Sequence, residues 1–212
     1  MKRHFQTGSH KARRHFFVRL MPASLVLAIV AFVFFRSPPP QRTGEVEATI
    51  TELVRREGLL YRPNEPHPFT GYLVERYPSG ALKSRSAIQD GLLHGISIGW
   101  HTNGQMEVRE QFISGVSDGL RTKWYSDGNP LSESTIRKGA HHGTFRRWHE
   151  NGQIAEQVEM NAGKPDGLSM AWYPSGFLKA RTRLVNGQPA QQEFWKDGEA
   201  PALAAAEGNV RP

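Results

Sequence analysis

The chain has 212 residues, of which 38% are hydrophobic, and it contains 21 glycines and no cysteine. This length allows one domain or two small ones, and the lack of cysteine excludes disulfides, thiolate metal sites and a lipid-modified cysteine. The net charge of +7 comes from the first 36 residues, because the rest of the chain carries 20 basic and 20 acidic residues, so the basic balance indicates no nucleic-acid partner.

The N-terminal part has the pattern of a membrane anchor. Residues 1–19 are basic, and residues 16–35 are apolar apart from Arg19. A helix of about 20 apolar residues spans a bilayer core, and basic flanks stay on the cytoplasmic side. The run ends in the bulky Phe34 and Phe35 rather than in the small residues of a signal-peptidase site. We expect an uncleaved, single-pass anchor in the cytoplasmic membrane, with a cytoplasmic N-terminus and a periplasmic C-terminal part; two adjacent arginines before the run also resemble a twin-arginine export signal.

A linker and a cap are expected next. Residues 36–44 are rich in proline, which favours an extended spacer. Apolar residues between 45 and 57 recur at the spacing of one helical face and predict a short helix. With a lead-in strand at 59–62, this helix would make residues 45–70 a cap over the exposed edge of the repeats that follow. Residues 199–212 are small and polar, as in a disordered tail.

Five repeats of 24 residues and a final half unit, Gln191 to Gly198, fill the chain from 71 to 198. Each full repeat begins with a glycine, and two further glycines follow nine and twenty residues later. A fixed period of this size is the signature of a repeat architecture. The glycine at the tenth position ends a two-residue turn signal such as Asn103-Gly104, which predicts a type I′ hairpin. The five turn glycines are Gly80, Gly104, Gly128, Gly152 and Gly176. The fold expected is all-β: an elongated antiparallel meander of five hairpins.

Three columns of residues, each occupying one position of successive repeats, describe the faces of this sheet. The Trp column (Trp100, Trp124, Trp148 and Trp172) and the apolar column (Ile88, Phe112, Ile136, Met160 and Leu184) are expected to form the structural core. The Tyr/His column (Tyr77, His101, Tyr125, His149 and Tyr173) directly follows the Trp column, so we expect it on the opposite face. Amphipathic aromatic residues suit protein or glycan contact, and this column is our candidate face for a partner.

The spacing G-x4-W-[YH]-x-[SND]-G-x10-G resembles the MORN-repeat-variant motif of bacterial proteins labelled YwqK-type antitoxins. The resemblance covers about residues 56–198, and it implies a repeat fold that binds and neutralises a toxic protein. Combined with export, it favours an immunity-like or scaffold role outside the cytoplasmic membrane. The first repeat departs from the motif, with Arg76 in the Trp column, and the last unit is a half repeat with Phe194 and Trp195 in place of the Trp and Tyr/His positions.

Enzyme signatures are weak. Gly115 to Gly119 match G-x-S-x-G, but that motif needs a strand followed by a helix. Both glycines also belong to the series of glycines that recur at fixed positions of the repeats. The adjacent pair His141 and His142 would diverge in a strand, which disfavours a metal site. We expect no catalytic residue, no metal and no cofactor.

Three functions remain open. The favoured one is a membrane-anchored, non-catalytic module that binds a protein partner, held to the lipid bilayer by its N-terminal helix. The alternative is a cell-envelope structural protein that contacts peptidoglycan or lipid headgroups directly. An enzyme acting on envelope polymers would need a pocket that only the folded chain could assemble.

Overall fold

The computed structural model describes residues 46–199. The expected basic segment, membrane anchor and proline-rich linker lie outside these residues, as does the tail after Glu199. Within 46–199, no helix has the length and apolar character needed to cross a membrane.

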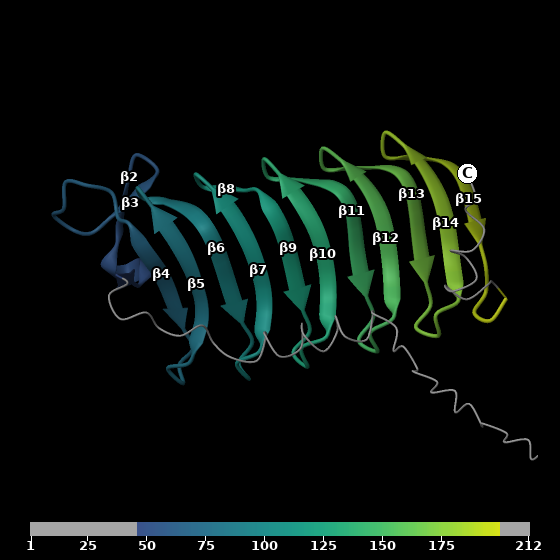
Figure 1. Ribbon diagram of the computed structural model, residues 1–212, viewed down its shortest axis with the longest axis horizontal. Helices are drawn as coiled ribbons and strands as arrows, with labels where there is room; N and C mark the ends of the chain where they lie inside the picture. The colour runs from purple at the N-terminus through teal and green to yellow at the C-terminus, as the bar shows by residue number, and fades with distance from the viewer. Residues whose placement is uncertain (1–45, 200–212) are drawn as a thin grey trace, which may run out of the picture. The chain divides into compact units, whose positions relative to one another are not determined.

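The described residues form one long sheet whose strands lie side by side almost entirely in chain order (Figure 1). A second, two-stranded sheet of β2 and β3 stands at its N-terminal end. The elements are β1 (Glu47–Ala48), the 3-10 helix η1 (Ile50–Glu52), β2 (Val54–Arg56), β3 (Leu59–Tyr61), β4 (Gly71–Arg76), β5 (Leu82–Gln89), β6 (Leu92–Trp100), β7 (Met106–Ile113), β8 (Val116–Ser117), β9 (Gly119–Trp124), β10 (Pro130–Arg137), β11 (Ala140–Trp148), β12 (Ile154–Asn161), β13 (Lys164–Trp172), β14 (Leu178–Val185) and β15 (Gln188–Phe194).

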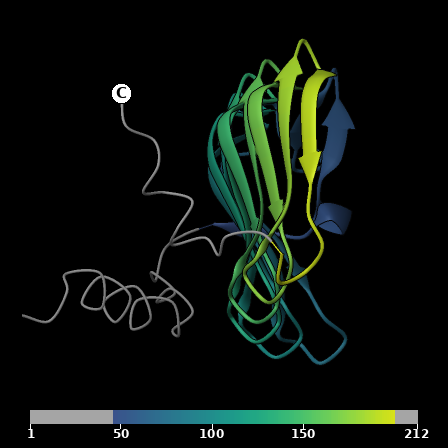
Figure 2. The ribbon, with the colours of Figure 1, turned by 90° about the vertical axis from the view of Figure 1, so that its right-hand side faces the viewer.

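The antiparallel meander expected from the repeats is confirmed. From β4 to β15 each strand pairs antiparallel with its neighbours in the chain, and β8 and β9 share β7 as a partner. Seen along its long axis, the sheet is a single layer, with the β2–β3 hairpin beside it at the N-terminal end (Figure 2). Each repeat is therefore one hairpin.

The register shows what the opening glycine of each repeat does. It lies directly opposite the apolar-column residue of the same repeat, as in Gly95 with Phe112 and Gly119 with Ile136. We call the face that carries the apolar column the core face. Strand alternation puts the Trp column on the other side, which we call the Trp face. Ile88, Ile136, Trp100 and Trp172 are buried, and the other members of the two columns are partly buried.

The prediction of type I′ turns at the tenth-position glycines is wrong. At Asn103-Gly104 only the glycine has a positive φ, of 83°, and the backbone of His101 bonds to both Gly104 and Gln105. This is the three-residue loop of a type I turn followed by a left-handed residue. The type I′ turns are instead at the third glycine of each repeat: Ser114 and Gly115, for example, have φ of 48° and 83°. The asparagine side chain favours the type I form by accepting the N–H of Gln105.

The predicted capping helix is also wrong. Residues 46–57 form β1, the three-residue η1 and β2 instead of a helix. The side chains that would have formed the helical face are exposed at Val46, Ile50 and Val54, and only Leu53 is buried. Glu47 and Ala48 pair in parallel with β4 at the edge of the sheet, and this pairing prevails over the helical spacing of the apolar residues. Tertiary contacts override propensity in such short segments.

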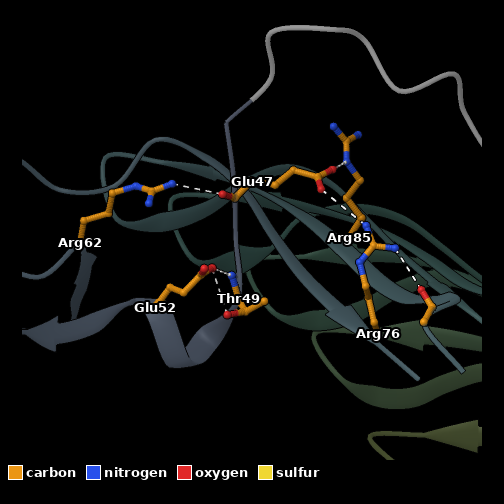
Figure 3. A network of polar contacts seen from close by, with 7 residues as sticks. Glu47, Thr49, Glu52, Arg62, Arg76 and Arg85 are labelled. Carbon is orange, nitrogen blue, oxygen red and sulfur yellow. Dashed lines mark hydrogen bonds and ion pairs between the residues drawn. The ribbon is translucent and has the colours of Figure 1, made fainter. Parts of the chain in front are cut away.

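The segment still caps the sheet, by packing and by charge. Ala48, Leu53, Leu60 and Phe69 form one buried cluster with Ile88 of the core face. Around this cluster, the carboxylate of Glu47 lies 3.3 Å from Arg85 and 3.8 Å from Arg76, and its backbone carbonyl accepts from Arg62 (Figure 3). Thr49 and Glu52 close a capping box on η1 beside it.

Candidate functional site

The Tyr/His column lies beyond the ends of the strands. Each strand that carries a Trp ends at that residue, so the next side chain begins the hairpin loop. Each ring extends to the next repeat and hydrogen-bonds the backbone carbonyl of its Trp. The five bonds are Tyr77 to Trp100 (2.7 Å), His101 to Trp124 (3.0 Å), Tyr125 to Trp148 (2.8 Å), His149 to Trp172 (2.9 Å) and Tyr173 to Trp195 (3.0 Å).

These bonds give the column a structural role that the sequence did not predict. All five rings are half-buried, and their polar tips already have partners. The sequence predicts the Tyr/His column on the face opposite the Trp column. Instead, its rings lie in the hairpin loops and join each loop to the next. Trp195 also takes the Trp position in the final half unit, where the sequence had aligned Phe194. A partner-binding role for the column stays a prediction.

Tyr125→Phe tests the contribution of one such bond. The change leaves the Trp148 carbonyl without its donor, so we expect a loss of about 1–2 kcal/mol in the free energy of unfolding. The matched control is Tyr72→Phe, because the Tyr72 ring packs on Arg85 at 3.3 Å and its hydroxyl makes no hydrogen bond within residues 46–199. Urea denaturation of both variants measures the difference. Equal stability of the two variants would contradict the role assigned to the Tyr125 hydroxyl.

A second series of contacts runs along the opposite edge of the sheet and was missed from the sequence. The last residue of each 24-residue period accepts the backbone N–H that opens the next type I′ turn. The acceptors are Thr70 for Asp90 (3.0 Å), His94 for Ser114 (3.3 Å), Asp118 for Lys138 (3.1 Å) and Asp166 for Asn186 (3.3 Å). The signal was present, since this column reads Thr, His, Asp, His, Asp. All five side chains can accept a hydrogen bond.

The weak enzyme signatures lie in ordinary repeat geometry. Gly115 belongs to a type I′ turn, and Ser117 lies in β8, which leads into β9 rather than into a helix. His141 pairs with Ile136 and His142 with Thr135, so the two histidines point to opposite faces. Among residues 46–199 no group of three or more potential ligands could hold a metal ion.

A depression of about 780 Å³ lies on the core face over β7 and β9. This volume is within the range of ligand-binding sites. Val108 and Leu131 contribute apolar surface, and Tyr125 and His101 close the end next to the hairpin loops. The depression therefore joins part of the Tyr/His column to the core face, which the sequence could not show.

Charged side chains occupy the middle of this depression. Glu110 and Arg121 form a cross-strand ion pair, and both are largely shielded from solvent. Lys123, paired with Val108 across the strands, is exposed and makes no ion pair within the described residues. The site thus offers one available cation next to an ion pair and an apolar surface. The Nε of Arg121 is buried without a hydrogen-bond partner.

His141 borders the same positive region. Burial lowers the pKa of the His141 imidazole, and the charges of Arg121 and Lys123 lower that pKa further. The ring makes an edge-to-face contact with Phe145, with centroids 5.9 Å apart. Neutral His141 is therefore the form that fits the folded state.

This shift predicts a pH dependence of stability. A histidine with a lowered pKa in the folded state binds fewer protons there than in the unfolded chain, so stability falls as pH drops below the ordinary pKa of about 6.5. We expect His141→Gln to reduce the loss of thermal stability between pH 7.5 and pH 5.5 relative to the natural chain. Thermal denaturation at several pH values checks this, and identical pH profiles for the two proteins would contradict it.

Comparison with known proteins identifies the repeat. A model of the MORN repeat variant matches residues 142–162, which run from β11 through β12. No curated protein matches the chain. Among solved structures, the chain is similar to a mutant of S. aureus TarM in complex with Fondaparinux, alpha-GlcNAc-glycerol and UDP. That similarity has 15% identity and a TM-score of 0.30 and covers 45% of this chain and 19% of TarM, too little to bear on function.

The matched repeat shares its spacing with its neighbours on both sides. The chain therefore contains a MORN repeat variant at residues 142–162.

Proposed function

We propose that the chain is a non-catalytic binding module that holds a protein partner on the core face of its sheet. The observation that supports this most is the depression over β7 and β9. It combines an apolar surface with an exposed cation, Lys123, on a sheet face that no other described element covers at this point. Protein interfaces typically have such a partly apolar centre with polar groups around it.

The depression lies over β7 and β9, in the middle repeats, where the strand that follows β7 is divided into β8 and β9. The N-terminal cap buries the core face around Ile88 of β5, and β9, which carries Lys123, is the third strand along from β5. Binding in the depression would require no rearrangement of the two series of hydrogen bonds described above, those of the Tyr/His column and those to the type I′ turns. Both series lie in the loops at the ends of the strands. The site therefore suits recognition by a preformed surface, which loses little entropy on binding.

Location and partner class extend this proposal. The apolar segment at residues 16–35 would anchor the module in the cytoplasmic membrane and place the repeats on its outer side. There the module would act in an immunity-like or scaffold role, in keeping with the resemblance to YwqK-type antitoxins. The proposed partner is then a protein of the same compartment.

Affinity capture of the full chain from detergent-solubilised membranes of its own host tests the proposal. We expect one protein to co-purify, and Lys123→Glu to reduce its recovery by about tenfold or more, since reversing a charge at an interface opposes association. The matched control is Arg109→Glu. Arg109 pairs with Thr122, one residue away from the Val108–Lys123 pair, and lies on the Trp face.

Two results would contradict the proposal. One is equal recovery of the partner by both charge-reversed variants, which would exclude the core face as the interface. The other is loss of the partner with Arg109→Glu alone, which would place the interface on the Trp face.

A further inference from the structure

The two ends of the long sheet differ. At the N-terminal end, β1 pairs with β4, and Glu47 binds Arg76 and Arg85 beside it (Figure 3). At the C-terminal end, β15 pairs with β14 on one side only. All seven residues of β15 are exposed, and no strand of residues 46–199 pairs with its outer edge. An open edge strand of this length is a template for another strand.

The hydrogen-bond pattern shows which groups of β15 face outward. The N–H of Trp195 donates to the carbonyl of Lys179 in the previous repeat. Backbone groups alternate in direction along an antiparallel strand, so Glu193 and Gln191 also face β14. Gln192 and Phe194 then direct their N–H and C=O groups away from the sheet. Ala190 lies in a β-bulge between the Arg183–Gln191 and Leu184–Pro189 pairs. Pro189, which has no N–H, lies on the far side of this bulge from Gln192.

We propose that a second copy of this chain pairs with β15 through its own β15, antiparallel and centred on Gln192. A self-complementary edge of this kind forms a closed twofold dimer. In this register Gln192 lies opposite its own copy, and Ala190 lies opposite Phe194. The outward groups of Gln192 in the two copies exchange about two backbone hydrogen bonds, those of Phe194 extend the pairing as far as the bulge at Ala190, and the two sheets become one.

The side chains of β15 fit this register. Phe194 is 69% exposed; it lies opposite Ala180 on the core face, and it would extend over the bulge at the small Ala190 of the other copy. On the Trp face, Glu193 would lie opposite Gln191, whose amide can donate to the carboxylate. No two like charges face each other, and Glu193 keeps its ion pair with Arg181. At the N-terminal end of the described residues, the pairing of β1 with β4 and the ion pairs of Glu47 occupy the edge, which favours a closed dimer over a filament.

Thiol crosslinking tests the register, because the natural chain has no cysteine. In the full chain in detergent, Gln192→Cys should give a crosslinked dimer with a short bifunctional thiol reagent, since hydrogen-bonded pairs have Cα atoms about 5.5 Å apart. Gln89→Cys is the matched control, an exposed glutamine on β5 near the other end of the sheet. Equal crosslinking of both variants, or none at position 192, would overturn the proposal.

Two variants test whether the edge drives association. Gln192→Pro removes an outward N–H without breaking a bond to β14, and Gln192→Lys puts two like charges on the twofold axis. Each variant should raise the dissociation constant of the dimer, measured by sedimentation, by about tenfold or more. The circular dichroism spectrum should stay unchanged. Added salt should restore association only for Gln192→Lys, because it screens the two like charges. A dimer that persists in both variants is held elsewhere, for example by the apolar segment, and contradicts the proposal, as does a natural chain that stays monomeric.

Discussion

Gly91→Ala should destabilise the protein by about 2–5 kcal/mol, through strain and a steric clash together. Gly91 has a φ of +79° in its type I′ turn. A Cβ at this position would lie 2.8 Å from the Cβ of Leu59 and 2.9 Å from the backbone nitrogen of Leu60. Both atoms belong to β3 and cannot move without displacing the cap, whose Leu60 N–H is bonded to the Gly91 carbonyl.

Gly187→Ala is the matched control for this effect. Gly187 has the same turn position and a φ of +81°, but a Cβ there would meet no atom within 4 Å. Its replacement should cost only the backbone strain, about 1–2 kcal/mol. Urea denaturation followed by tryptophan fluorescence measures both variants. If Gly187→Ala costs as much as Gly91→Ala, the cap does not pack on this turn as described.

The second large effect is expected at Ile136. Its side chain is only 1% exposed and lies between Gly119 and His141 on the core face. Truncation to alanine leaves a cavity, and the flanking strands cannot close it because backbone hydrogen bonds hold them in place. Ile136→Ala should therefore lower the free energy of unfolding by about 2–5 kcal/mol. Ile113→Ala, at a side chain 48% exposed, should cost less than about 1 kcal/mol. Similar losses for the two variants in urea denaturation would show that the apolar column does not form the core.

The repeat period was enough to predict the architecture. The spacing of the three glycine series determined where each strand ends, and side-chain alternation separated the apolar column from the Trp column. Both are local properties that tertiary contacts reinforce, because every repeat packs only on its neighbours. This is why the meander could be predicted without a structure.

The turns and the cap could not be predicted in the same way. Asn-Gly is compatible with more than one turn, and the choice depended on a side-chain bond between Asn103 and Gln105 together with a bond from Asn103 to Ser126 of the next repeat. At the cap, the spacing of Val46 and Ile50 favoured a helix, but pairing of Ala48 with β4 decided the outcome. Contacts between residues distant in the sequence determined the structure at both places.

The candidate site shows the same division. The sequence singled out Tyr125 and His101, and both border the depression. Lys123 and the Glu110–Arg121 pair were not singled out, because at none of their positions does the same charged residue recur in most of the repeats. The site residues occupy positions whose residue type varies from repeat to repeat, so they leave no periodic signal in the sequence. They can be recognised as a site only when the register of the strands is known.

The proposal that the core face binds a protein is tested most directly by site-specific photocrosslinking in the native host. A photoreactive amino acid at position 123, on the core face, should yield one discrete adduct with another protein. The same probe at position 109, on the Trp face of the neighbouring strand, should yield none. An adduct at 109 alone, or the same adducts at both positions, would contradict binding through the depression on the core face.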